Sequence, residues 1–338
     1  MSSTPRVLFV TRPYIAIRSG GLARKIRRLE RELRARGIEV CLYDPWTNAI
    51  PHVDACHIFG DAGTLCYFAQ EAASQGRKVF VSPVLGGFDV PFWLFRLKTT
   101  LSGRVPGLYS DYVLLRRMLR MTTKVLPLHE AEADRVARGF GVPREKIEIV
   151  PNGVDHEFAS GDPGWCRRTY NNGRFVLQVG TIDANKNQLA SVRAAKASGV
   201  PLLVVGQPYL GTEAYFDRCT AEGGPVTFAG HLPADSPELR SCFAAASAFV
   251  LPSRSEVMPQ VLYQAAAAGL PTLVSRTIPL PPRIEAHVTR VDADDVQELG
   301  RAFQAAVHRE RATALQEVAL SMPSWADVAA QLEAIYRA

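Results

Sequence analysis

The residues with the clearest chemical potential lie between two prolines in the second half of the chain. Residues 252–271 read Pro-Ser-Arg-Ser-Glu-Val-Met-Pro-Gln-Val-Leu-Tyr-Gln-Ala-Ala-Ala-Ala-Gly-Leu-Pro. The pattern predicts a strand that ends at Pro252, a loop that presents Glu256, and a helix that carries Gln264. The first amides of such a helix are free donors at the positive end of its dipole, so they suit a phosphate or a polyhydroxyl ligand. On this stretch alone, the alternative is an ordinary strand–helix–strand unit with a solvated Glu256.

The same alternation of short β-branched runs and helix-period segments continues along the whole chain. Strands are predicted over residues 7–11, 38–43, 55–59, 78–82 and 124–128, and again over 174–180, 201–206, 226–229, 248–252 and 271–275. Helices are predicted over residues 21–36, 63–75, 109–121, 130–140, 187–198, 237–246, 256–268 and 325–336. A repeated β–α order predicts parallel sheets with helices on both faces.

A break in the middle of the chain divides this pattern into two domains. Residues 150–155 read Val-Pro-Asn-Gly-Val-Asp, and residues 160–173 are rich in Gly, Asp and Asn and are predicted to form a loop. We predict a Rossmann-like domain over 1–155, a second over 156–322, and a final segment over 323–338 whose helix packs back toward the N-terminal domain. The predicted fold class is α/β, with two Rossmann-like domains whose parallel sheets face a central cleft.

Five motifs, taken together and in order, resemble those of one enzyme family. They are Ser19-Gly20-Gly21 with Gly37-Ile38-Glu39-Val40, the segment from Val150 to Asp155, Val179-Gly180-Thr181 with Lys186-Asn187, the segment from Phe228 to Pro233, and residues 252–271. This order resembles the retaining glycosyltransferases of the GT-B fold, family four (glycosyl transferases group one), over nearly the whole chain. The resemblance implies that residues 1–155 bind the acceptor and that residues 156–322 bind a nucleotide-diphosphate sugar.

The resemblance also implies roles for individual residues. Glu256 would contact hydroxyls of the donor sugar, Lys186 would be the cation on the diphosphate, and Gln264 lies where the family has a Glu for the ribose. Glu256, Lys186 and Asp89 are the predicted catalytic residues, although Asp89 has an alternative role as a helix N-cap near Pro91. The predicted donor-binding residues are Gly20, Gly21, Thr181, Lys186, His231, Leu232, Arg254, Glu256, Met258, Pro259, Gln260, Val261 and Gln264.

Elementary chemistry agrees with these roles. A diphosphate leaving group gains negative charge in the transition state. The resemblance implies that no metal or other cofactor is needed, so a lysine and helix-terminal amides must stabilise that charge. Thr181 stands where the family most often has Arg, which leaves Lys186 alone or makes Arg254 or Arg12 a second cation. Because a carboxylate accepts ribose hydroxyls better than an amide does, Gln264→Glu is expected to be tolerated.

The distribution of charge predicts an anionic partner for the first half of the chain. Residues 1–150 hold 23 Lys and Arg against 14 Asp and Glu, whereas the remainder holds 16 against 19. The helix over residues 22–36 carries the cations Arg24, Lys25, Arg27, Arg28, Arg31, Arg34 and Arg36. This basic face predicts contact with an anionic membrane, and a solvated helix face is the alternative. Nothing in the pattern indicates a nucleic-acid-binding module.

These observations combine into one functional prediction. We expect a metal-independent, retaining glycosyltransferase that moves a sugar from a nucleotide-diphosphate sugar to a saccharide or lipid-linked saccharide of a bacterial surface glycan, such as lipopolysaccharide. The six cysteines lack Cys-x-x-Cys spacing and no apolar run reaches about 18 residues, so we expect reduced thiols and a cytoplasmic protein, peripheral on the inner face of the membrane. An epimerase or phosphorylase of the same fold, and a nucleotide-sugar-binding protein without catalysis, are the alternatives.

Overall fold

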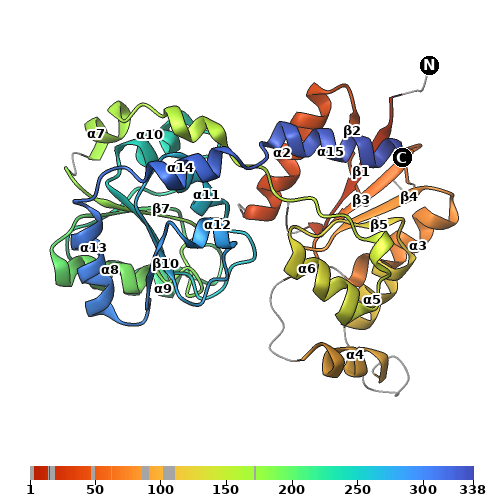
Figure 1. The fold of residues 1–338 in the computed structure, drawn as a ribbon, viewed down its shortest axis with the longest axis horizontal. Coiled ribbons are helices and arrows are strands. Elements are labelled where there is room, and N and C mark those ends of the chain that lie inside the picture. Colours follow the sequence, from red (N-terminus) through yellow and green to blue (C-terminus); the bar gives the residue numbers. More distant parts are fainter. Residues whose placement is uncertain are drawn as a thin grey trace. The chain divides into compact units, whose positions relative to one another are not determined.

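The computed structural model of the 338-residue chain divides into two compact units (Figure 1). It describes residues 4–13, 15, 20–46, 50–61, 63–85, 91–101, 111–170 and 173–338. Unit 1 comprises Met1–Gly153 together with Trp325–Ala338, and unit 2 comprises Val154–Ser324. The C-terminal helix is therefore part of unit 1.

Unit 1 is built on a five-stranded sheet in the order β2-β1-β3-β4-β5, in which every pairing is parallel. The strands are β1 (Arg6–Val10), β2 (Glu39–Leu42), β3 (Ala55–Phe59), β4 (Lys78–Ser82) and β5 (Lys124–Val125). The chain winds from β1 to β2 on one side and then crosses to β3 on the other. The switch point of this sheet thus lies between the carboxyl ends of β1 and β3, where ligands bind in open α/β sheets.

Helices cover both faces of the sheet in unit 1. On one face, α2 (Gly21–Ala35) and α15 (Trp325–Arg337) pack against each other and against the strands. On the other face lie η1 (Gly63–Leu65), α3 (Cys66–Ser74), α4 (Phe92–Leu101), α5 (Asp111–Met121), α6 (Glu130–Asp134), the π-helical segment η2 (Arg135–Gly139) and η3 (Arg144–Lys146). The side chains of the strands alternate between two separate apolar cores, as the period of two in a β-strand requires.

Unit 2 contains a six-stranded parallel sheet in the order β11-β10-β9-β6-β7-β8. The strands are β6 (Val176–Val179), β7 (Leu202–Val205), β8 (Val226–Phe228), β9 (Ala248–Leu251), β10 (Thr272–Ser275) and β11 (Thr289–Val291). This is the doubly wound order of the Rossmann fold, with its switch point between β6 and β9.

The helices of unit 2 also form two layers around the sheet. One face is covered by η4 (His156–Ser160), α7 (Gly164–Tyr170), α10 (Pro237–Ala245), α11 (Gln260–Ala267), α12 (Pro282–Glu285) and α14 (Thr313–Leu320). The other is covered by α8 (Gln188–Ser198), α9 (Glu213–Ala221) and α13 (Val296–Ala306). The two parallel-sheet α/β units confirm the predicted fold class.

Two predicted elements differ from the structure for local reasons. The loop predicted over residues 160–173 contains helix α7, because its apolar Cys166 is buried against the core of unit 2. The strand predicted over 124–128 is only the two-residue β5, since the amide of Leu128 donates to the Glu132 carboxylate instead of extending the ladder with β4.

All six cysteines are free thiols, five of them buried. Among the described residues, no helix is long and apolar enough to cross a membrane.

Candidate functional site

The switch point of unit 2 holds an ion pair between two of the predicted catalytic residues. Lys186 lies in the connection that follows β6, and Glu256 lies in the loop that follows β9. The Lys186 ammonium donates a hydrogen bond to Oε1 of Glu256. Because their side chains are only 23% and 12% exposed, water screens this pair less than it screens a surface pair. The structure thus brings together two residues that are 70 positions apart in the sequence.

Glycines form the floor beneath the lysine. The side chain of Lys186 passes over Gly180, where an added Cβ would lie 3.6 Å from the lysine Cδ and Cε atoms. At Gly206, after β7, φ is +154° and an added Cβ would lie 1.9 Å from the carbonyl oxygen of Gly180. A side chain at position 206 would therefore push apart the carboxyl ends of β6 and β7.

The end of β8 continues this glycine-lined edge. The amide of Gly206 donates to the carbonyl of Gly230 at 2.8 Å, and Gly230 has a φ of +71°. Of the predicted donor-binding residues that follow β8, His231 is exposed, whereas Leu232 is half-buried against the core of unit 2. Both follow β8, the edge strand two positions from β6, so they lie at the same carboxyl edge of the sheet as the switch point.

Asn185 joins the two loops that carry the ion pair. Its Nδ2 donates to the carbonyl of Ser255 at 3.1 Å, and its Oδ1 accepts from the amide of Ser255 at 3.1 Å. The Asn185 carbonyl accepts from the amide of Arg254 at 2.8 Å. One residue thus makes three hydrogen bonds to the neighbouring loop, in a pattern that resembles strand pairing. These bonds fix the backbone on the residues next to Lys186 and Glu256.

The loop that carries Lys186 is also held from within unit 2. The Lys186 amide donates to Oδ1 of Asp183 at 2.8 Å, and its carbonyl accepts from Nε2 of Gln178 at 2.8 Å. Thr181, predicted to bind the donor, is half-buried, and its carbonyl accepts from Nε2 of Gln188 at 2.9 Å. The backbone of Lys186 is therefore set before any ligand binds.

The periodic segment over 256–268 is helical only from Gln260, the first residue of α11, which agrees with the predicted loop at Glu256. Pro259 is its N-cap, in an extended conformation with φ −72° and ψ 105°, and this leaves Glu256 in the preceding loop rather than in the helix. Pro259 and Gln260 are buried, and Met258 and Val261 are half-buried against the core. These side chains anchor the loop, so the groups it can offer to an anionic ligand are backbone amides.

Gln264 occupies a different setting from the one predicted. It is fully buried in α11, and its Nε2 donates to Oδ2 of Asp155 at 3.0 Å, whereas its Oε1 has no hydrogen-bond partner in the described part of the chain. Asp155 is only 1% exposed. A glutamate at position 264 would place a second carboxylate against this buried one, so the expectation that Gln264→Glu is tolerated does not hold in this geometry.

Arg254 does not join Lys186 in the structure. Its guanidinium makes two hydrogen bonds to the Asp294 carboxylate, at 2.8 and 3.2 Å. Together they border a cavity of about 160 Å³ at the carboxyl ends of β9, β10 and β11. Within the described residues, no three His, Cys, Asp or Glu side chains are grouped so that they could hold a metal ion.

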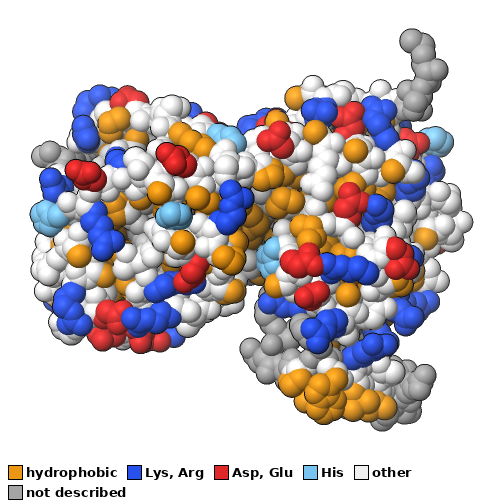
Figure 2. All heavy atoms as spheres, viewed as in Figure 1, with side chains coloured by type: hydrophobic (Ala, Val, Ile, Leu, Met, Phe, Trp, Pro, Cys, Tyr) orange, Lys and Arg blue, Asp and Glu red, His pale blue; other side chains and the backbone are white. Residues whose placement is uncertain are grey.

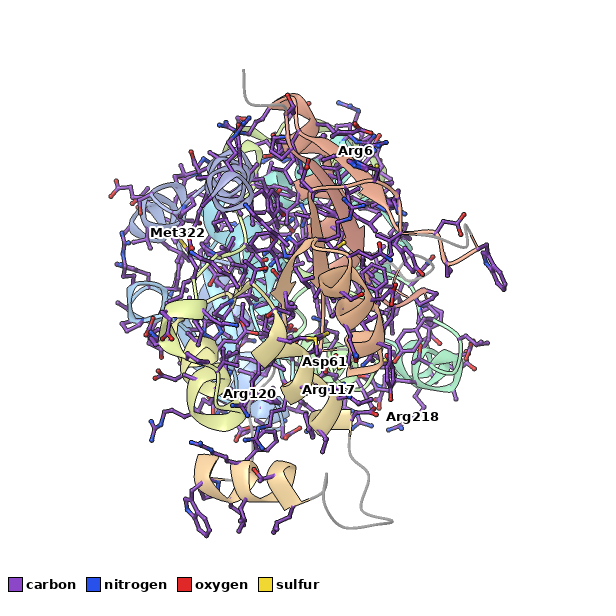
Figure 3. All side chains as sticks on the ribbon, turned by 90° about the vertical axis from the view of Figure 1, so that its right-hand side faces the viewer. Arg6, Asp61, Arg117, Arg120, Arg218 and Met322 are labelled. Carbon is purple, nitrogen blue, oxygen red and sulfur yellow. The ribbon has the colours of Figure 1, made fainter. Side chains whose placement is uncertain are left out.

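The predicted site residues of unit 1 are placed only in part. Gly20 is the N-cap of α2 and Gly21 its first residue, and an added Cβ on either would meet no atom within 4 Å. Asp89 lies outside the described residues. At the switch point of this sheet, Arg12 after β1 forms an ion pair of 3.5 Å with Asp61 after β3 (Asp61 is labelled in Figure 3).

A buried polar chain under α15 was missed by sequence reasoning. Nδ1 of His57 in β3 lies 2.6 Å from the Tyr336 hydroxyl, and its Nε2 lies 2.9 Å from Oγ of Ser82. Burial, together with the nearby charge of Lys25, lowers the pKa of His57 well below its usual value, so the ring is neutral. This chain ties the C-terminal helix to β3 and β4. A histidine within an otherwise apolar strand was the available signal.

The loops after β4 and β5 share one buried carboxylate. Glu132 of α6 accepts from the amide of Leu85 at 2.5 Å and from the amide of Leu128 at 2.6 Å. His129 caps the same helix, because its Nδ1 accepts from the Glu132 amide at 3.2 Å, and burial lowers the pKa of His129. Both residues therefore support the carboxyl edge of the sheet in unit 1.

The basic face predicted for α2 is smaller than expected. Lys25 and Arg28 are buried, because α15 packs along α2 and widens its covered face. The exposed residues Arg31, Arg34 and Arg36 pair with the glutamates Glu32, Glu30 and Glu333, respectively. The prediction that all seven cations lie on an outward face is wrong for Lys25 and Arg28.

Comparison with known proteins identifies both units. Residues 173–309 match the family model for glycosyl transferases group 1, and residues 46–153 match that for the glycosyl transferase 4-like domain. D-inositol 3-phosphate glycosyltransferase 1 of Catenulispora acidiphila is 27% identical over 229 residues, which are 61% of this chain and 55% of that protein. The chain spans about half the length of the curated relatives it matches.

Solved structures share the fold over almost the whole chain. Anabaena HepE, in complex with UDP and glucose, has a TM-score of 0.72 at 13% identity, covering 99% of this chain and 100% of that one. Sucrose-phosphate synthase of Thermosynechococcus elongatus has a TM-score of 0.75 at 18% identity, covering 99% and 98%. Each unit thus matches a glycosyl transferase family model, and the chain resembles the glycosyl transferases group 1 and shares the GT-B fold of these neighbours.

Proposed function

We propose that the protein is a retaining glycosyltransferase that moves a sugar from a nucleotide-diphosphate sugar to a saccharide or lipid-linked saccharide acceptor of a bacterial surface glycan. The observation that carries the proposal is the Lys186–Glu256 pair at the switch point of unit 2. A cation and a carboxylate side by side match the two halves of such a donor, an anionic diphosphate and a polyhydroxyl sugar. A neighbour of the same fold was solved with UDP and glucose, which supports this donor class.

Lys186 supplies the charge that the reaction needs. As the bond between the anomeric carbon and the diphosphate breaks, the electron pair goes to the leaving oxygen, and negative charge grows there. A fixed ammonium group at this position stabilises the transition state more than the ground state. The bonds from Asp183 and Gln178 hold the Lys186 backbone in place beforehand, so little reorganisation is required. We propose that this chemistry proceeds without a metal.

Glu256 orients both the lysine and the sugar. One carboxylate oxygen accepts from Lys186, and a carboxylate retains acceptor sites for sugar hydroxyls. Sugar hydroxyls bound to a half-buried, charged acceptor make stronger hydrogen bonds than they do in water. Sugars that place no hydroxyl near Glu256 are expected to be poor donors.

A panel of nucleotide-diphosphate sugars, including UDP-glucose, tests the proposal. A true donor at about 100 times its Kd raises the free energy of unfolding by about 2.7 kcal/mol, which a thermal shift detects. The donor found is then incubated with saccharide acceptors, with and without EDTA, and the anomeric configuration of the product is read by NMR. Transfer with retention that survives EDTA is the expected result.

The same assay separates the alternatives. Conversion of the donor sugar to its epimer, or its release only with inorganic phosphate, would identify an epimerase or a phosphorylase instead. A thermal shift without any turnover would identify a nucleotide-sugar-binding protein without catalysis. Inversion of the anomeric configuration would overturn the retaining mechanism alone.

A further inference from the structure

Helix α4 exposes an apolar face that no described element covers. Trp93 is 69% exposed, Leu94 40%, Leu97 47% and Leu101 44%. These four residues follow the helical period and form one stripe of large side chains. Figure 2 shows the stripe as a continuous hydrophobic surface at the outer end of unit 1. Scattered exposed apolar residues are ordinary, but a stripe of four on one helix marks an interaction surface.

The opposite side of α4 is firmly attached to unit 1. Phe95 is buried, with its ring 5.2 Å from that of Phe140 and 5.1 Å from that of Tyr112, both edge-on. The Arg116 guanidinium donates to Oγ1 of Thr100 on α4 and, at 3.2 Å, to the carbonyl of Phe140. The exposed stripe is therefore the outward face of a docked helix, with its direction fixed by the core.

Cations surround this stripe. Helix α4 has no acidic residue, and it packs against α5 and η2. Exposed arginines lie on all three elements, namely Arg96, Arg117, Arg120 and Arg138. Figure 3 labels Arg117 and Arg120, both on α5, and the Arg117 guanidinium also donates to Oε1 of Gln70 on α3 at 3.0 Å. Large apolar side chains flanked by arginines are the composition of a helix that lies in a membrane interface.

We propose that α4 docks unit 1 on an anionic membrane surface, with its apolar stripe among the acyl chains and the flanking arginines at the headgroups. A second copy of the chain fits the stripe less well. A two-fold contact would bring each patch onto itself and oppose like-charged arginines. This proposal rests on the proposed function in one respect: a lipid-linked acceptor lies in a membrane, which gives the enzyme a reason to bind there. Vesicle binding is measured without sugar transfer, so either proposal can fail alone.

Co-sedimentation of the full chain with phosphatidylcholine vesicles, with and without phosphatidylglycerol, tests the apolar part. The double variant Trp93→Ser/Leu97→Ser should bind anionic vesicles at least about tenfold more weakly, because two large side chains no longer leave water. The matched control is Trp46→Ser, which removes a tryptophan of unit 1 that is 87% exposed but lies outside α4. It should bind as the wild type does. All three side chains are exposed, so the variants should melt as the wild type does.

A second pair of variants tests the charges and decides between the two helices. Each arginine near an anionic surface contributes a factor of about five, so Arg117→Gln/Arg120→Gln should weaken binding about 25-fold. Arg31→Gln/Arg34→Gln on α2 removes two arginines that already pair with glutamates, and it should change binding less than twofold. Raising the salt concentration should weaken wild-type binding.

Three results would overturn the proposal. One is wild-type protein that ignores anionic vesicles at low salt. Another is binding that survives Trp93→Ser/Leu97→Ser unchanged. The third is a dimer in sedimentation analysis that this variant converts to a monomer, since the stripe would then be covered by a second copy of the chain.

Discussion

Both switch points of the molecule hold a cation and a carboxylate, but the pair of unit 2 is the more deeply buried of the two. In unit 2, Lys186 and Glu256 are mostly buried, and Asn185 joins their loops by three hydrogen bonds. In unit 1, Arg12 and Asp61 lie 3.5 Å apart, with side chains 32% and 57% exposed. Strand order alone thus brings opposite charges together, while the local hydrogen bonds decide which pair is preorganised for chemistry.

The two units also differ in the surroundings of a lysine that follows the first strand of each sheet. Lys186 stands over the glycine floor and has a carboxylate partner. Lys25 in α2 is buried, and its ammonium has no hydrogen-bond partner among the residues that the structure describes. Burial lowers the pKa of Lys25 to about 8, against a smaller opposing effect of Glu132. Lys186 is therefore positioned to act on a ligand, whereas the burial of Lys25 lowers the free energy of unfolding.

The largest expected effect is that of Lys186→Ala. It should lower turnover by about 10²–10³ at saturating donor, because a fixed charge in a partly dry site is lost. Arg12→Ala is the matched change at the other switch point. Because an exposed ion pair contributes about 0–1 kcal/mol, the turnover of this variant should fall by no more than about fivefold. Steady-state kinetics of both variants measures the contrast. Equal losses would break the comparison between the two pairs.

Gln264→Glu should destabilise unit 2 by about 3 kcal/mol or more near neutral pH. The new carboxylate would face buried Asp155, and an uncompensated buried charge carries a cost of that order. Urea unfolding measures the loss, which should shrink at acidic pH as one carboxyl takes up a proton. Gln264→Met, similar in size and uncharged, is the control. A Gln264→Glu protein as stable as the wild type would show that a counter-ion or solvent reaches the buried site between residues 155 and 264.

Lys25→Met should stabilise the protein at pH 7 by up to about 3 kcal/mol, since the ammonium no longer has to be buried. Between pH 8 and about 10.5 the unfolded chain binds this proton and the folded chain does not, so wild-type stability should rise with pH and the difference between the proteins should shrink. Urea unfolding at pH 7 and pH 9.5 checks this. Arg27→Met, exposed on the same helix, should show no such trend. A destabilised Lys25→Met protein would refute the unfavourable burial.

The sequence was sufficient for the fold and for the two ends of the catalytic pair. Periodicity located the strands of both sheets except β11, and the motif around Glu256 placed it in a loop at a carboxyl end. The pairing with Lys186 depends on β9 lying beside β6, which is a matter of strand order rather than of spacing. Similarly, nothing near Gln264 indicated Asp155, because the two are 109 positions apart.

The errors on α2 and α4 have a common physical cause. Helical period assigns one buried stripe to a helix, but α2 packs on the sheet and also on α15, which arrives from the far end of the chain and covers Lys25 and Arg28. Helix α4 was not among the predicted helices, and of its described side chains Phe95 is buried while Trp93 is 69% exposed. Which side of a helix is covered depends on elements distant in sequence, and local pattern does not contain them.

The smallest expected effect sharpens the comparison most, because it leaves both charges in place. Asn185→Ala keeps Lys186 and Glu256 but removes the two side-chain hydrogen bonds to Ser255, so the loops are no longer joined at that point. Turnover should fall about tenfold, the order expected when two net hydrogen bonds that position a charge are lost. Donor Kd should change much less, since the phosphate-binding lysine and amides remain. Asn187→Ala, at a residue of the same loop whose side chain bonds Ala293 rather than the Glu256 loop, is the control for general loop damage.

Asn185→Asp tests the geometry further, because a carboxylate can still accept from the Ser255 amide but cannot donate to its carbonyl. It should fall between Asn185→Ala and the wild type. If Asn185→Ala turned over at the wild-type rate, the ion pair would hold its own position, and the difference between the two switch points would reduce to burial alone.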